Sequence, residues 1–192
     1  FGHYSIAGEL GLVTSFWITL TQIFSSNLRS IILSENKIEY AFSTLFYRIF
    51  VSIIFYILAY VFILQFISFE NKNLIALFSL LILVQWINEM SLVKSEVNKK
   101  SLIFTIYSIV NLITLILSVI CLYFSYFNFL MYIIFGYILF LVFSIIANYY
   151  KFHEKNFNIN YKLFYQLNIR TIAFLSSFSI VISSFAWSMM IY

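Results

Sequence analysis

The sequence predicts an all-α protein, a polytopic transmembrane helix bundle of six spans. Of its 192 residues, 63% are hydrophobic and only 9% are charged, and the mean hydropathy is +0.98. An ordinary soluble domain is about 45–50% apolar and about 25% charged. A water-soluble fold of this length could not bury so much apolar surface, because its surface is too large for its volume. We therefore expect an integral membrane protein.

Six apolar stretches are long enough to cross a bilayer as helices, for which about 20 residues suffice. They are Tyr4–Leu28, Leu45–Ser68, Leu74–Leu92, Leu102–Tyr126, Phe129–Tyr150 and Thr171–Tyr192. Helix is expected because lipid offers no partner for exposed backbone groups and because no period-2 alternation is present. The break near Phe127–Asn128 carries no charge. We place it there because one helix over residues 102–150 would be too long to span once.

The basic residues predict the orientation of the spans. Ten of the eleven Lys and Arg residues fall in the connections after the first, third and fifth spans, if Arg48 in the first turn of the second span is counted with the connection before it. This alternation follows the positive-inside rule, so we expect these connections in the cytoplasm and the Phe1 end outside. The sequence begins at Phe1 without Met and stops at Tyr192 within an apolar run. We therefore expect an internal portion of a longer polytopic protein.

No motif predicts an enzyme or a metal site. All seven acidic residues are Glu, and Cys121 is the single cysteine, which excludes aspartate-based metal sites and an internal disulfide. His3 and His153 lie far apart without a second ligand nearby. We expect no enzyme activity, no cofactor and no metal. The net charge of +4 indicates basic cytoplasmic connections rather than nucleic-acid binding.

The first span carries most of the candidate substrate-cavity residues. At about 100° per residue, one narrow stripe of this helix holds Tyr4, Gly8, Gly11, Ser15, Thr19, Gln22, Ser26 and Arg29. Such a stripe either lines a water-filled cavity or lets a neighbouring helix pack closely. We favour packing for residues 8–15. For Gln22–Arg29 we favour a cavity, because a long amide and a guanidinium do not suit tight packing.

Other polar residues in the spans form weaker patterns. The sixth span follows Arg170 and has Ser176, Ser179 and Ser183 on one side, which are further cavity candidates. Such hydroxyls can instead bond to the carbonyl one turn back. The fourth span has a narrower polar stripe, formed by Ser108, Asn111, Thr114 and Ser118. For this stripe we favour hydrogen bonds to a neighbouring helix.

Three charged residues near span ends complete the candidate set. Arg48 is a cavity candidate, with snorkelling of its guanidinium to the headgroups as the alternative. Glu9 and Glu89 are candidates for proton coupling, because carboxylates within spans often carry protons in transporters. The alternatives are that Glu9 is solvated at the membrane surface and that Glu89 pairs with Lys94 or another loop base.

The opening Phe1-Gly2-His3-Tyr4-Ser5 resembles the Phe-Gly-x-Tyr-Ser stretch at the start of the second helix of polysaccharide-biosynthesis flippases. These are the Wzx-like, O-antigen members of the multidrug/oligosaccharidyl-lipid/polysaccharide exporter superfamily. The order of spans also resembles the second to seventh helices of that family. The resemblance implies that residues 1–150 form five helices of an N-terminal lobe without its first helix. It implies a cytoplasmic linker over residues 151–169 and the first helix of a second lobe over residues 170–192.

The resemblance also implies a function. The family's second and seventh helices help line a central cavity, which alternates between the two sides of the membrane. The expected function is a flippase that moves lipid-linked oligosaccharide of the undecaprenyl-diphosphate type across the bacterial cytoplasmic (inner) membrane. Its product would serve the synthesis of surface polysaccharide, including lipopolysaccharide, with other polysaccharide-assembly membrane proteins as partners. The alternatives are a cation-coupled multidrug antiporter of the same superfamily and a membrane-embedded polysaccharide polymerase or transferase.

Overall fold

A computed structural model describes residues 3–25, 29, 32–33, 39–66, 71–97 and 101–153 of the chain. These residues form helices and turns and no strand, which confirms the all-α prediction for this part of the protein. The helices are α1 (His3–Ser25), α3 (Glu39–Phe66), α4 (Lys72–Ser91), α5 (Val93–Val97), α6 (Ser101–Tyr123) and α7 (Phe127–His153).

Four of these helices are long and apolar enough to cross a membrane. The stretches are Ala41–Leu58 in α3, Lys72–Ser91 in α4, Leu102–Tyr123 in α6 and Phe127–Asn148 in α7. They match the second to fifth predicted spans. Helix α1 covers most of the first predicted span but is not one of these four helices, so its crossing of the membrane stays a prediction. The sixth predicted span, Thr171–Tyr192, lies outside the described residues, and so does all of the predicted linker beyond His153. The count of six spans therefore stays a prediction.

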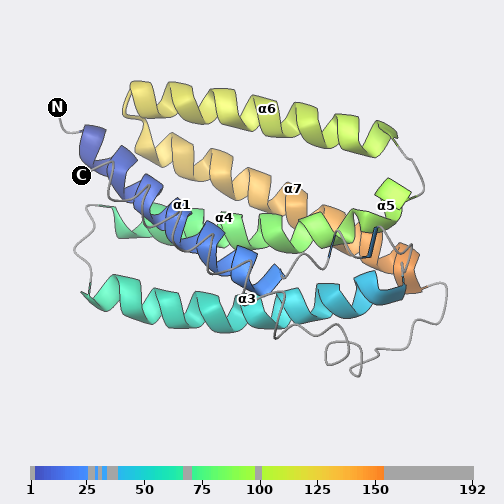
Figure 1. Ribbon diagram of the computed structural model, residues 1–192. Helices are drawn as coiled ribbons and strands as arrows, with labels where there is room; N and C mark the ends of the chain where they lie inside the picture. The colour runs from blue at the N-terminus through green and yellow to red at the C-terminus, as the bar shows by residue number, and fades with distance from the viewer. Residues whose placement is uncertain are drawn as a thin grey trace.

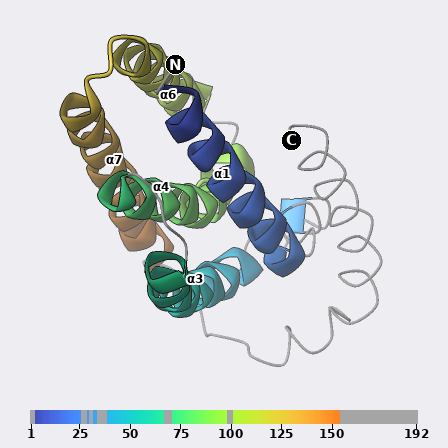
Figure 2. The ribbon, with the colours of Figure 1, turned by 90° about the vertical axis from the view of Figure 1, so that its left-hand side faces the viewer.

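Helix α4 is the centre of the described bundle. It packs against α7, α3 and α1, whereas α6 packs against α7. Figure 1 shows α6, α7, α4 and α3 stacked in this order, with α1 crossing in front of α4. The end-on view in Figure 2 places α7 and α1 on different sides of α4. Exposed apolar side chains cover much of α6, as expected of a helix that faces lipid, and include Leu102, Ile109, Leu112, Leu115 and Val119.

The core consists of two hydrophobic clusters. The larger cluster includes Trp17 from α1, Leu74 from α4 and Leu141 from α7. The smaller cluster lies where α4 ends and includes Ile32, Phe42, Leu45, Met90 and Val93. Because Ile32 belongs to the α1–α3 connection, the smaller cluster ties this connection to α3, α4 and α5.

The connection between α6 and α7 confirms that residues 102–150 do not form one helix. Ser125 has a φ of 62°, in the left-handed region that turns the chain sharply. The Tyr126 N–H donates to the Cys121 carbonyl at 2.9 Å, which closes the last turn of α6. The new helix begins at Phe127, two residues before the predicted start of the fifth span.

Successive long helices run in opposite directions along the bundle, as Figure 1 shows. The ends of α1, α4 and α7 therefore lie together with α5 and with the starts of α3 and α6. We call this end of the bundle the basic end, because Arg29, Arg48 and Lys94 belong to it, whereas Lys72 starts α4 at the opposite end. That the basic end faces the cytoplasm is a prediction from the positive-inside rule.

The smaller core cluster predicts a stability effect. Met90 is fully buried, so we expect Met90→Ala to lower the free energy of unfolding by about 2–5 kcal/mol, through lost contacts and a residual cavity. The matched control is Leu112→Ala on the exposed surface of α6, with an expected change within about 0.5 kcal/mol. Unfolding of the purified protein with a denaturing detergent measures both values. Equal losses in the two variants would contradict the assignment of Met90 to the core.

Candidate functional site

Two arginines and two glutamates meet at the basic end. Arg29 donates from Nη1 to Glu89 Oε1 at 3.3 Å and from Nη2 to Glu96 Oε2 at 2.6 Å. Arg48 donates from Nη1 to Glu89 Oε2 at 3.1 Å. Glu89 therefore offers one carboxylate oxygen to each arginine. We call these four residues the Arg–Glu cluster.

The two glutamates face Arg29 because of their spacing. Glu96 follows Glu89 by seven residues, which is close to two turns of helix, and α5 continues the chain directly after α4. The backbone N–H of Glu96 donates to the carbonyl of Leu92 at 3.0 Å, which carries helical geometry across the junction. Both carboxylates consequently reach the same guanidinium, which comes from the connection between α1 and α3.

Arg48 is the buried member of the cluster, with 1% of its side chain exposed. Its Nη1 also donates to the Trp86 carbonyl at 2.6 Å, and its guanidinium lies 5.0 Å from the centre of the Trp86 ring. The Trp86 indole N–H donates to Ser25 Oγ at 2.6 Å. Arg48 thus joins α3 to α4, and Ser25 adds the end of α1. The structure places Arg48 among packed side chains, where it neither snorkels to a surface nor lines an open one.

The charges of the cluster balance. Two guanidinium groups face two carboxylates, so the four members of the cluster together carry no net charge. Exposure separates Arg48 from the other members: the exposed fraction of the side chain is 33% for Arg29, 43% for Glu89 and 36% for Glu96, but 1% for Arg48. Arg29 is therefore the cation of the cluster that a solute can reach.

The polar stripe of α1 lies on the open side of that helix. The opposite side packs into the bundle through four buried residues, Leu10, Val13, Trp17 and Thr21. Gln22 is exposed, and a Cβ added at Gly8 or Gly11 would meet no atom within 4 Å. The stripe is therefore open at Gly8, Gly11 and Gln22. The packing expected for residues 8–15 stays a prediction, because the sixth predicted span lies outside the described residues.

The hydroxyls of this stripe are satisfied within the helix itself. Ser15 Oγ donates to the Gly11 carbonyl at 3.0 Å, and Thr19 Oγ1 donates to the Ser15 carbonyl at 2.8 Å. The oxygen of such a hydroxyl still has lone pairs available for a further donor. The side chain of Ser26, the remaining candidate of the stripe, lies outside the described residues.

A second polar network occupies another side of α4. Asn88 Oδ1 accepts hydrogen bonds from Ser91 Oγ and from the Tyr107 hydroxyl of α6, each at 3.0 Å. Asn148 of α7 donates from Nδ2 to Ser91 Oγ at 3.4 Å. This network was not predicted from the sequence. The only signal for it was the presence of Asn88 and Asn148 in apolar spans, where polar groups need partners.

The predicted stripe of α6 shows both kinds of hydrogen bond. Asn111 Oδ1 accepts from the Tyr137 hydroxyl of α7 at 3.3 Å, which confirms the expected bond between helices for this residue. Thr114 instead donates to the Val110 carbonyl of its own helix at 2.8 Å. The stripe thus contributes one bond between α6 and α7 and is partly satisfied internally.

The remaining candidate residues are two glutamates on the described helices and four residues near the C-terminal end of the sequence. Glu9 is half-buried in the first turns of α1, far along that helix from the Arg–Glu cluster. Glu89 pairs with Arg29 and Arg48, whereas the side chain of Lys94, the partner named from the sequence, lies outside the described residues. The other four candidates lie outside the described residues: Arg170, Ser176, Ser179 and Ser183.

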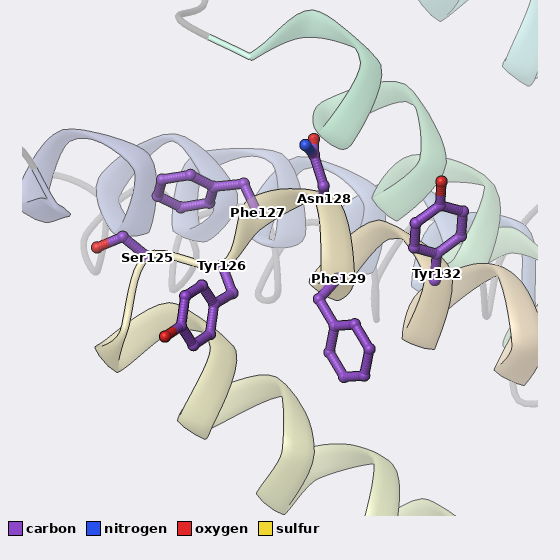
Figure 3. A pocket seen from close by; sticks show the side chains of 6 residues that line it. All are labelled: Ser125, Tyr126, Phe127, Asn128, Phe129 and Tyr132. Atoms are coloured by element: carbon purple, nitrogen blue, oxygen red, sulfur yellow. The ribbon is translucent and has the colours of Figure 1, made fainter.

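An open hollow of about 570 Å³ lies at the end of the bundle opposite the cluster. Its lining comes from the α6–α7 turn and the first turns of α7, and consists of Ser125, Tyr126, Phe127, Asn128, Phe129 and Tyr132 (Figure 3). None of these side chains is charged. Tyr126 and Tyr132 are 61% and 74% exposed, as is typical of aromatic residues that anchor helices at a membrane surface. The hollow is thus separate from the charged chemistry of the basic end.

Comparison with known protein families, with curated proteins and with solved structures finds no match to this chain. Among the described residues, the Arg–Glu cluster and the open stripe of α1 are therefore the features that bear on function.

The cluster predicts unequal costs for its two arginines. Arg48→Leu removes the buried partner of Glu89 and of the Trp86 carbonyl, so we expect a loss of about 3–5 kcal/mol in the free energy of unfolding. Arg29→Leu breaks partly exposed pairs, so we expect a loss of about 1 kcal/mol or less. Detergent-induced unfolding of both purified variants measures the difference. A larger loss for Arg29→Leu would show that the burial assigned to Arg48 is wrong.

Proposed function

We propose that this chain belongs to a membrane transporter that flips lipid-linked oligosaccharide across the bacterial cytoplasmic membrane by alternating access. The lipid would be of the undecaprenyl-diphosphate type, and the product would serve surface polysaccharide synthesis. The proposal includes the six spans, the two lobes and the inter-lobe linker expected from the sequence. One observation carries it: the polar stripe of α1 is turned away from the helices that α1 packs against.

Polar groups are costly in the hydrocarbon of a membrane. The exposed amide of Gln22 would lose several kcal/mol of hydration if it faced lipid chains. On a membrane-embedded helix, its open side therefore needs either water or another polar protein surface. A water-filled path lined by an amide and hydroxyl oxygens suits sugars, because sugar hydroxyls both donate and accept hydrogen bonds.

The position of Arg29 supports an anionic carrier lipid. Arg29 follows Gln22 by seven residues and belongs to the basic end. A guanidinium binds phosphate oxygens through two parallel N–H donors, with more directional strength than an ammonium group. One third of the Arg29 side chain is exposed, so a diphosphate at the basic end could reach it while the sugars contact the stripe.

The alternatives have less support. A cation-coupled antiporter needs a carboxylate that takes up and releases a proton, but protonation of Glu89 would break ion pairs with two arginines. Glu9 remains the candidate for that role. A polymerase or transferase needs a sizeable segment outside the membrane, and the described connection between α6 and α7 has only three residues, 124–126.

Thiol labelling tests whether the stripe meets water. In a Cys121→Ser background, we expect Ser15→Cys, Thr19→Cys and Gln22→Cys to react with a membrane-impermeant maleimide, because the reactive thiolate forms only where water reaches it. The matched controls are Ile109→Cys and Leu112→Cys on the exposed apolar surface of α6, which should not react. Labelling is measured in intact membranes by the mass shift of the protein. An unlabelled stripe would remove the observation on which the proposal stands.

Export of surface polysaccharide tests the function itself. We expect Arg29→Ala to abolish export at an unchanged protein level, and Gln22→Leu to lower it about five- to hundredfold, as loss of a hydrogen-bonding group worth about 1–3 kcal/mol predicts. The control is Ile18→Leu, an exposed apolar position of the same helix. The amount of glycan displayed per transporter molecule is measured. Normal display in Arg29→Ala would place this residue outside the substrate path.

A further inference from the structure

We propose that Arg29 is an exchange site for phosphate groups, which Glu96 occupies while no ligand is bound. A phosphate or diphosphate headgroup would take the place of the Glu96 carboxylate on the guanidinium, and Glu96 would return when the headgroup leaves. The exchange itself is inferred from the Arg–Glu cluster alone. Its role as a step of lipid transport rests on the function proposed above.

The two carboxylates that hold Arg29 are not equivalent. Glu89 is fixed on the central helix and is shared with the buried Arg48. Glu96 lies on the five-residue helix α5, and its contact with Arg29 is the shorter of the two, at 2.6 Å. Removal of Glu89 from the cluster would leave Arg48 without its carboxylate in a buried place, which is costly. Glu96 is therefore the partner that can be exchanged.

The solvent exposure and the hydrogen bonding of Arg29 both favour the binding of an incoming anion in the place of Glu96. Both members of the Arg29–Glu96 pair are about one third exposed, and ion pairs with such access to solvent are individually weak. The Arg29 Nε is shielded from solvent and has no hydrogen-bond acceptor among the described residues. A phosphate has three or more acceptor oxygens and can engage more of the guanidinium donors than one carboxylate oxygen does.

The exchange requires movement of a side chain rather than of a helix. Val93 and Ser95 of α5 are 0% and 6% exposed, and Val93 belongs to the smaller core cluster. Displacement of all of α5 would expose these residues. Rotation of the Glu96 side chain away from Arg29 leaves the core intact. A competing carboxylate that stays close by would also keep the headgroup from binding too tightly to be released.

Binding of inorganic pyrophosphate to the full chain in detergent tests the exchange. Titration calorimetry should show binding to the unsubstituted protein, loss of binding in Arg29→Gln, and about fivefold tighter binding in Glu96→Gln, where the competitor is gone. Glu9→Gln is the matched control, because it changes the net charge equally at the far end of α1 and should leave the affinity unchanged. Thermal unfolding of each variant confirms that it is folded.

Two results would overturn the exchange site. Equal tightening in Glu96→Gln and Glu9→Gln would show a general effect of net charge. An unchanged or weaker affinity in Glu96→Gln, in a variant that unfolds at the normal temperature, would show that Glu96 does not compete. Either result is independent of whether the protein transports lipid.

The source of the phosphate is tested with vesicles of two compositions. We expect vesicles that contain undecaprenyl diphosphate to displace pyrophosphate, and phosphatidylglycerol vesicles of equal phosphate content not to do so. Equal displacement by phosphatidylglycerol would keep the exchange site but overturn its assignment to the carrier lipid, and with it the link to the proposed function.

Discussion

A buried positive charge determines how the basic end is built. Arg48 is almost fully enclosed, and an unpaired guanidinium in such surroundings would be too costly to keep. Glu89, the Trp86 carbonyl and the Trp86 ring all contact it. Because Glu89 also holds Arg29, the neutralisation of Arg48 fixes the carboxylate that orients a second, reachable guanidinium. The positions of α3, α4 and the α1–α3 connection are coupled through this one carboxylate.

Helix α4 can hold Glu89 between the two arginines because polar contacts fix this helix on more than one side. Glu89 faces the arginines, whereas Asn88 and Ser91 bond to Tyr107 of α6 and Asn148 of α7. Hydrogen bonds between helices are favoured in an apolar surrounding, because the unbonded groups would find no water. The open stripe of α1 thus belongs to a helix that packs on a firmly held centre. In the proposed transporter, this firmly held centre would let one lobe rock against the other as a unit.

The periodicity of the sequence predicted the helices and the polar stripe of α1. The residue partners between helices, which depend on packing, were not predicted. The apolar stretches gave the helices, and a spacing of three and four residues gave the stripe from Gly8 to Gln22. The pair of Arg48 and Glu89 could not be predicted, since the residues lie 41 positions apart and meet only when α3 packs on α4. One local signal was overlooked: Glu89 and Glu96 are two helical turns apart, which indicates a shared cation. The burial of Arg48 had no signal, because a basic residue near a span end equally fits snorkelling.

The balanced charges of the Arg–Glu cluster place a condition on how it could bind the anionic lipid of the proposed function. An excess of positive charge would attract any anion over about 10 Å, the screening distance at moderate ionic strength. The Arg–Glu cluster provides no such excess, because its two arginines are matched by two glutamates. Within the cluster, the proposed binding of phosphate at Arg29 then depends on short-range competition, in which a ligand gains by offering better acceptor geometry than a carboxylate. Under the proposed function, this would favour phosphate groups over simple anions and would leave the sugars to contact the stripe of α1.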